Sequence, residues 1–223
     1  MFDTIVYVKV GPDAIVFSIH KGVLCEGSAF FRAAFDGRFK EATEQTVLLP
    51  EADVDIFERY QAWAYSDRIV QRGETIKDLG YEMIIGLYIL AELCCIPRLQ
   101  NAAIDIIIDK AAFHHTVPPM TCSRLIYENT TSASLLRELF EDMTTRSRLR
   151  DHESFDTETS ELYDNAFLVD LALALDEERR CRAPGGFKKH LNDLRCNYHI
   201  HPEGEPRCNV GGKTVRFDVI KKR

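Results

Sequence analysis

Two short segments of alternating side chains near the start of the chain constrain its fold more than any other feature. Residues 4–10 and residues 14–20 each alternate between two sides of an extended backbone, and Gly-Pro-Asp separates them. The side chains that share one side are Val6, Val8 and Val10 in the first segment and Ile15, Phe17 and Ile19 in the second. This period predicts two β-strands joined as a hairpin. The chain therefore begins with a sheet.

Helical periodicity follows the hairpin. Ser28 is a good N-cap for a helix that stops at Gly37, residues 46–49 predict a third strand, and Asp53 can cap the next helix. The apolar residues on the shared helix faces are Phe30, Phe31, Ala34 and Phe35, and then Ile56, Phe57, Tyr60, Trp63 and Ala64. We therefore expect Phe31 and Phe35 to pack in the core beside the helix that carries Trp63.

Two further helices complete the first half of the chain. Residues 82–95 predict a helix that is buried on most sides, and Pro97 suits the first turn of another. The apolar stripe of that second helix comprises Leu99, Ala103, Ile104, Ile107 and Ile108. The order β-β-α-β-α-α-α predicts an α+β fold, with a small β-sheet flanked by a cluster of α-helices.

The second half predicts additional C-terminal helices. We assign residues 1–112 to the α+β domain and residues 113–148 to a helical extension, with helices near 122–127 and 135–143. Residues 149–161 predict an acidic loop or linker, because they hold several carboxylates and few apolar side chains. The C-terminal segment, residues 162–223, begins with a helix expected over 162–180 and ends in a tail that contains cysteine and histidine.

Charge and apolar content limit the classes of partner. The 28 basic and 35 acidic residues leave a net charge of −7, which disfavours nucleic acid and anionic membranes as partners. The longest apolar run, residues 83–91, is far shorter than the ~18 residues of a membrane span. The N-terminus lacks the basic and small-residue pattern of a signal peptide, and the seven cysteines are an odd number. We therefore expect a cytoplasmic or nuclear protein whose cysteines are thiols or metal ligands.

The same residues carry a resemblance to a known family. The chain resembles fungal-type BTB/POZ proteins over roughly residues 3–110, because several short motifs occur in the family's order. These motifs are Asp3, residues 17–25 (FSIHKGVLC), 28–31 (SAFF), 39–41 (FKE), 47–50 (VLLP), 63–65 (WAY), 87–92 (LYILAE) and 96–101 (IPRLQN). The likeness is weaker beyond residue 115, where residues 126–130 and 196–201 also look familiar.

The resemblance implies a protein-interaction module without catalytic activity. Domains of this family associate with themselves, join a substrate receptor to a cullin-type ubiquitin-ligase scaffold, or recruit transcriptional partners. Many dimeric members carry an extra helix and strand ahead of the position of Asp3, and this sequence begins later. We therefore expect a monomer or a weak dimer, with other proteins as partners and no small-molecule substrate.

Four residues are candidate partner-binding residues on the strength of the resemblance. Asp3 and Lys21 resemble a charged pair that lines a pocket at the base of the domain. Phe39 and Glu41 have the hydrophobic-x-acid spacing that some cullin-binding members show after the same helix. Both pairs also have a structural interpretation: the charges could simply stabilise each other, and Phe39 could pack under the sheet while Glu41 stays in water.

One cluster in the tail has the character of a metal site. Cys196, His199, His201 and Cys208 provide two thiols and two imidazoles, the ligand set that Zn²⁺ takes tetrahedrally. Histidines two residues apart on an extended segment would project from the same face. A structural zinc ion is therefore a possible cofactor, and a zinc-binding regulatory protein is the alternative function. The other interpretation is an ordinary polar tail, because the spacing differs from that of common zinc fingers.

Overall fold

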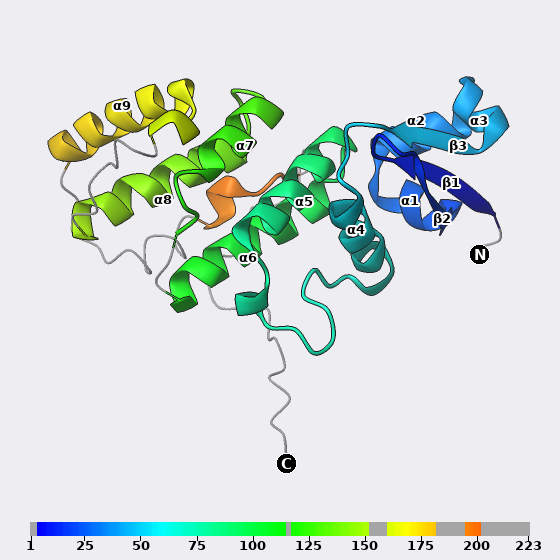
Figure 1. The fold of residues 1–223 in the computed structure, drawn as a ribbon, viewed down its shortest axis with the longest axis horizontal. Helices are drawn as coiled ribbons and strands as arrows, with labels where there is room; N and C mark the ends of the chain where they lie inside the picture. Colours follow the sequence, from blue (N-terminus) through cyan, green and yellow to red (C-terminus); the bar gives the residue numbers. More distant parts are fainter. Residues whose placement is uncertain (1–3, 115–116, 152–159, 182–194, 202–223) are drawn as a thin grey trace, which may run out of the picture.

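The structure, a computed structural model, describes residues 4–114, 117–151, 160–181 and 195–201. A three-stranded sheet lies at one end of an otherwise helical molecule, and helices follow one another away from it (Figure 1). Within the described ranges, no helix is long and apolar enough to cross a membrane.

The sheet has the order β2-β1-β3. Its strands are β1 (Ile5–Val10), β2 (Ile15–His20) and β3 (Thr46–Leu49). The predicted hairpin is confirmed, because β1 pairs with β2 in antiparallel register, whereas β3 runs parallel to β1. The alternating valines of β1 are fully buried against the helices, and Ile19 of β2 is buried with them, although Ile15 at the start of β2 is exposed.

The predicted helix starts near the sheet are confirmed. Ser28 Oγ accepts the Phe31 N–H at 3.0 Å, and Asp53 Oδ1 accepts the N–H groups of Asp55 and Ile56 at 2.9 and 3.0 Å. These caps begin α2 (Ala29–Asp36) and α4 (Val54–Ser66). Two short helices were not anticipated from the sequence, α1 (Lys21–Gly27) and α3 (Lys40–Glu44), and neither has a side-chain cap.

Aromatic side chains join α2 to α4, as expected. Phe31 and Phe35 are buried, and their rings stack with centroids 6.1 Å apart. The ring of Phe31 also stacks on Tyr60 of α4 at 6.4 Å, and Tyr60 contacts Trp63 at 6.2 Å. Offset ring pairs at these distances contribute beyond the area that they bury.

The central helices are α5 (Tyr81–Leu93) and α6 (Pro97–His114), preceded by the 3₁₀ turn η1 (Ile76–Asp78). Most side chains of α5 are buried, as its continuous apolar sequence predicted. The whole predicted stripe of α6 is buried too, at 0–1% exposure from Leu99 to Ile108. This helical pair therefore forms the middle of the core.

The C-terminal elements are α7 (Cys122–Asn129), α8 (Leu135–Asp151), η2 (Ser160–Leu162), α9 (Asn165–Cys181) and η3 (Arg195–Tyr198). The helix expected at 135–143 continues to Asp151, three residues into the predicted acidic loop. The helix expected from Leu162 begins at Asn165 instead, because Asp164 Oδ1 accepts the N–H groups of Ala166 and Phe167 as its cap.

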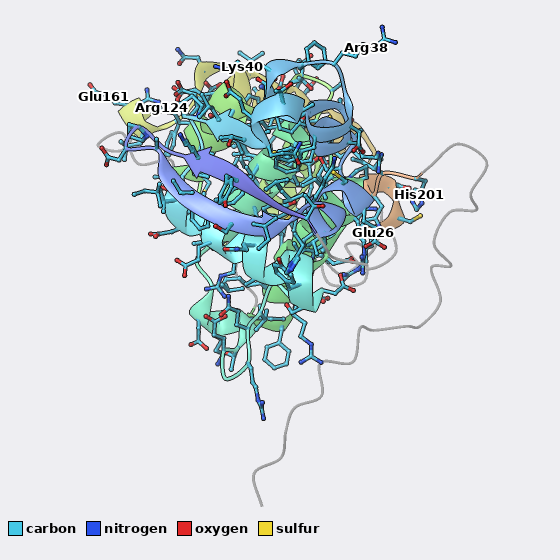
Figure 2. All side chains as sticks on the ribbon, turned by 90° about the vertical axis from the view of Figure 1, so that its right-hand side faces the viewer. Glu26, Arg38, Lys40, Arg124, Glu161 and His201 are labelled. Carbon is cyan, nitrogen blue, oxygen red and sulfur yellow. The ribbon has the colours of Figure 1, made fainter. Side chains whose placement is uncertain are left out.

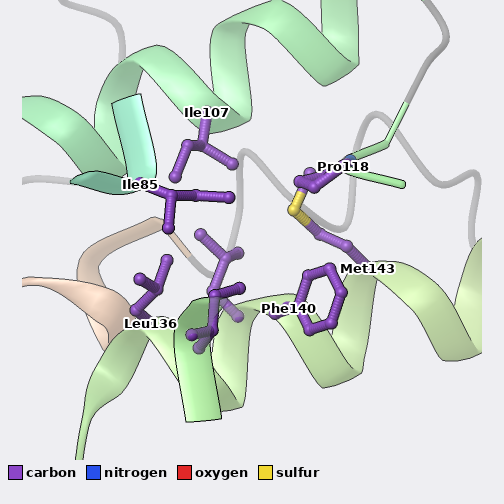
Figure 3. Close-up of a pocket in the computed structure, with 8 residues that line it drawn as sticks. Ile85, Ile107, Pro118, Leu136, Phe140 and Met143 are labelled. Atoms are coloured by element: carbon purple, nitrogen blue, oxygen red, sulfur yellow. The ribbon is translucent and has the colours of Figure 1, made fainter. Parts of the chain in front are cut away.

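The core is continuous from the sheet to α9. Figure 3 shows its middle, where α5 and α6 meet the extension across a gap too narrow for a water molecule. The walls of this gap are entirely apolar: Ile85, Ile107, Pro118, Ile126, Leu136, Leu139, Phe140 and Met143. Such dense packing indicates that the extension shares one core with the first 112 residues and is not a separate domain.

Candidate protein-interaction site

Phe39 lies in the tight connection between α2 and α3. Gly37 ends α2, and a Cβ atom there would come 2.1 Å from the backbone oxygen of Ala33, so this close approach requires glycine. The chain then turns outward, and the side chain of Phe39 is 65% exposed. The alternative in which Phe39 packs under the sheet is therefore wrong. Water surrounds a large apolar ring at the end of the molecule that carries the sheet.

Glu41 lies in the first turn of the five-residue helix α3 and is half-buried. A carboxylate is favoured there, because the first turn of a helix presents unpaired N–H groups. Lys40 pairs with Glu44 at 3.4 Å along the same helix, and Gln45 ends it in a left-handed conformation that leads directly into β3. Phe39 and Glu41 are thus held on a short element that is fixed at both ends, by α2 and by the sheet.

Lys21 has a partner within α2. Its Nζ lies 2.7 Å from Asp36 Oδ1 and donates to the backbone oxygen of Phe35 at 3.0 Å. A cation at the C-terminal end of a helix is favourable, so this contact fixes α1 against α2. Asp3, the predicted partner of Lys21, lies outside the described residues. The proposed Asp3–Lys21 pair therefore stays a prediction.

The segment from Arg195 to His201 forms a strap across α6 and α8 (Figure 1). Arg195 donates from Nη1 to Asp105 and from Nη2 to Asp109, both at 2.6 Å, and these carboxylates lie one turn apart on α6. Burial tends to raise the pKa of Asp105, but the hydrogen bonds from His199 and Arg195 outweigh it and hold that pKa below its ordinary value. Ion pairs with two carboxylates therefore hold the strap on α6.

Polar contacts continue along the strap to its end. Tyr198 donates its hydroxyl to Asp142 of α8 at 3.1 Å. Asn101 of α6 exchanges two hydrogen bonds with the backbone of Ile200, at 2.8 and 2.9 Å. The strap therefore contacts both α6 and α8, and ties the first half of the chain to the second.

The structure brings together two of the four predicted zinc ligands. Cys196 Sγ lies 3.3 Å from His201 Nε2. His199 instead places Nε2 3.1 Å from Asp105 Oδ1, and its ring lies 6.2 Å from that of His201. Cys208 lies outside the described residues. Among the residues whose placement is described, no three His, Cys, Asp or Glu side chains form a metal-binding group.

Two other cysteines have the properties of core thiols. Burial is the main cause that raises the pKa of Cys94 and of Cys122, each to about 12. Nearby charge on Cys95 adds to the effect at Cys94, and Glu82 does so at Cys122. Both thiols therefore stay protonated near neutral pH, whereas a cysteine nucleophile acts as the thiolate.

The outcome of the comparisons with known proteins agrees with this fold. Residues 1–110 match the family model described as the BTB/POZ domain. No curated protein matches the chain. The match covers the sheet and the helices through most of α6, and it includes Lys21, Phe39 and Glu41.

Proposed function

This chain carries a BTB/POZ domain over residues 1–110, and on that premise we propose that it is a non-enzymatic adaptor, cytoplasmic or nuclear, that binds a cullin-type ubiquitin-ligase scaffold. Domains of this family are protein-interaction modules. The observation that carries the finer proposal is the exposed ring of Phe39, two residues ahead of Glu41 at the start of α3. An apolar anchor with a charge at its edge is the usual composition of an interface hot spot.

Removing the ring tests this proposal. We expect Phe39→Ala to weaken binding to a purified cullin-type scaffold by about tenfold or more, because the apolar anchor is lost. Isothermal titration calorimetry with the full chain measures the effect. Phe113→Ala is the matched control, since Phe113 is also an exposed phenylalanine, at 73%, but lies at the far end of α6. That variant should bind like the wild type.

Charge reversal gives a second measurement at the same site. Glu41→Lys should also weaken binding to the scaffold, whereas Glu58→Lys, on the exposed side of α4, should leave that binding unchanged. Equal affinities of the Phe39 and Glu41 variants and the wild type would contradict the proposed site. If the wild-type chain does not bind the scaffold at all, the adaptor proposal in its cullin form fails, and self-association or another protein partner replaces it.

We propose zinc binding by the tail as the second candidate function. The supporting observation is the 3.3 Å approach of Cys196 Sγ to His201 Nε2, which is short enough for two ligands of one ion. His199 would have to leave Asp105 to join them, and Cys208 would supply the fourth ligand. Four protein ligands leave no open position, so such an ion would be structural.

Elemental analysis of protein purified without a histidine tag tests the zinc proposal. We expect close to one zinc ion per chain, lost in Cys196→Ser, because removal of one ligand of four destroys the site. Cys95→Ser is the control, since Cys95 is exposed and lies outside the tail. A folded wild-type protein that contains no metal would show that these residues belong to an ordinary polar tail.

A further inference from the structure

The sheet has a second face that no described helix covers. The inner face carries Val6 and Val8, which are fully buried, whereas the outer face carries the alternate side chains of the same strands. Its large apolar members are Ile5, Tyr7, Val16 and Leu48, with exposures between 43% and 62%. Figure 2 looks at the molecule from the end where the sheet lies and shows the strands in front of the helices.

These outer-face side chains form one patch. The register places Lys9 of β1 directly between Val16 of β2 and Leu48 of β3, and Tyr7 is the next outward residue of β1. Neighbouring residues on the same face of adjacent strands lie within contact distance. Ser18, His20 and Thr46 share the face, so four large apolar side chains are grouped there among polar ones. A group of exposed apolar side chains on one face of a folded domain indicates an interaction surface.

The charge of the patch indicates the chemistry of its partner. The outward positions of the three strands include Lys9 and no aspartate or glutamate, although the whole chain has a net charge of −7. No ion pair joins Lys9 to a carboxylate of the described residues. A partner that covers this patch must therefore supply a carboxylate to Lys9, because an unpaired buried ammonium is costly.

A second copy of this chain does not meet that requirement. Packing two such faces together would bring a second Lys9 into the same apolar contact, with no carboxylate from either sheet face to pair with it. Like charges in a desolvated interface oppose association. The charge pattern therefore favours a different protein over self-association at this face.

The dimensions of the face fit a helix. Three strands spaced about 4.8 Å apart make it about 10 Å wide, and six residues of β1 make it about 20 Å long. An α-helix is about 10–12 Å in diameter and rises about 1.5 Å per residue, so one helix of about 13 residues covers the face.

The sheet edges offer less to an added strand. Along β2, the side chain of Gln61 donates to the Ser18 backbone oxygen at 3.2 Å, and the Tyr65 hydroxyl accepts the His20 N–H at 3.1 Å. Both side chains come from α4 and occupy backbone groups on the free edge of the strand. The opposite edge, β3, has only four residues. A short edge and an occupied edge both disfavour strand addition.

We propose that the outer sheet face binds one amphipathic helix of a partner protein, three to four turns long, with carboxylates beside its apolar stripe. This site does not depend on the scaffold proposal, because it lies on the sheet and not on α3. A helix bound there would turn the sheet into the middle of three layers, with the domain's own helices on its other face.

Peptide display on the full chain tests the proposal. The probe is a phage-displayed library of peptides of about 14 residues, a length set by the size of the face. We expect enriched peptides to repeat apolar residues at helical spacing with flanking Asp or Glu, and synthetic copies should bind in fluorescence anisotropy. Leu48→Lys should weaken this binding by about tenfold or more, because a charge enters the centre of the contact.

Controls separate this face from other apolar surfaces. Leu173→Lys on α9 is matched to Leu48→Lys, since Leu173 is 67% exposed and apolar, and it should not change the affinity. Lys9→Glu should lower the affinity for an acidic peptide. Replacing the acidic residues of that peptide by lysine should restore the affinity for the Lys9→Glu variant. Phe39→Ala should leave peptide binding unchanged, so that failure of the scaffold proposal and failure of this one can be told apart.

Four outcomes would overturn the proposal. They are the absence of any enriched peptide, peptide binding that Leu48→Lys does not affect, enriched peptides that alternate as strands do, and a wild-type dimer in light scattering that Leu48→Lys dissociates. The last two would identify strand addition or a second copy of the chain as the true occupant.

Discussion

Replacing Phe35 by alanine is expected to lower the free energy of unfolding by about 3–5 kcal/mol. The side chain is 2% exposed and stacks on Phe31, which in turn stacks on Tyr60 of α4. Its removal leaves a cavity that the fixed backbone of α2 cannot close, because Ser28 caps one end of the helix and Lys21 binds the other. Urea denaturation followed by far-UV circular dichroism measures the loss.

The control for this prediction is again Phe113→Ala. Because Phe113 is 73% exposed, its replacement by alanine should change the free energy of unfolding by less than about 0.5 kcal/mol. If Phe35→Ala unfolds at the wild-type urea concentration with the same slope, the packing of α2 against α4 described above is incorrect.

Phe140→Ala is expected to destabilise the entire chain, and not only the extension, by about 3–5 kcal/mol. Phe140 is buried in α8, with its ring 4.9 Å from that of Phe167 in α9, and it lines the apolar gap shared with α5 and α6. Because one core joins the two halves, we expect a single cooperative transition.

The chain carries its own reporter for this experiment. Trp63 is its only tryptophan, and it is buried in α4, within the BTB/POZ domain. Its fluorescence should therefore follow the first half of the chain, and the Phe140→Ala midpoint should fall equally by fluorescence and by circular dichroism. A tryptophan signal that keeps the wild-type midpoint would show that the extension unfolds alone.

The parts of the fold that were predictable have local causes. The valines of β1, the caps Ser28 and Asp53, and the position of Pro97 at the start of α6 all depend on residues within a few positions of one another. Helices α1 and α3 lack that kind of signal. Only Leu24 of α1 is buried, and no residue of α3 is, so neither helix has an apolar stripe that a sequence pattern could reveal. Contacts such as that of Lys21 with Asp36 and the Phe35 backbone fix α1 instead.

The candidate sites divide in the same way. The outward position of Phe39 follows from the turn at Gly37, and the order of local motifs was sufficient to indicate this segment. The strap was not predictable, because Arg195 binds carboxylates about 90 residues earlier in the chain. Asp105 and Asp109, four residues apart on a predicted helix, were the available signal for a basic partner. Sequence reasoning placed His199 at zinc, whereas in the structure it bonds to Asp105.

The strap also sets an order of events during synthesis of the protein on the ribosome. Arg195 is translated 90 residues after Asp105 and 86 after Asp109. At about 5–20 residues per second, Arg195 is synthesised about 5–20 s after the two carboxylates that it pairs with. Throughout that interval they stand as like charges one helical turn apart, which opposes the C-terminal half of α6. The nascent N-terminal half should therefore be less stable, and more accessible to chaperones and proteases, until Arg195 binds Asp105 and Asp109.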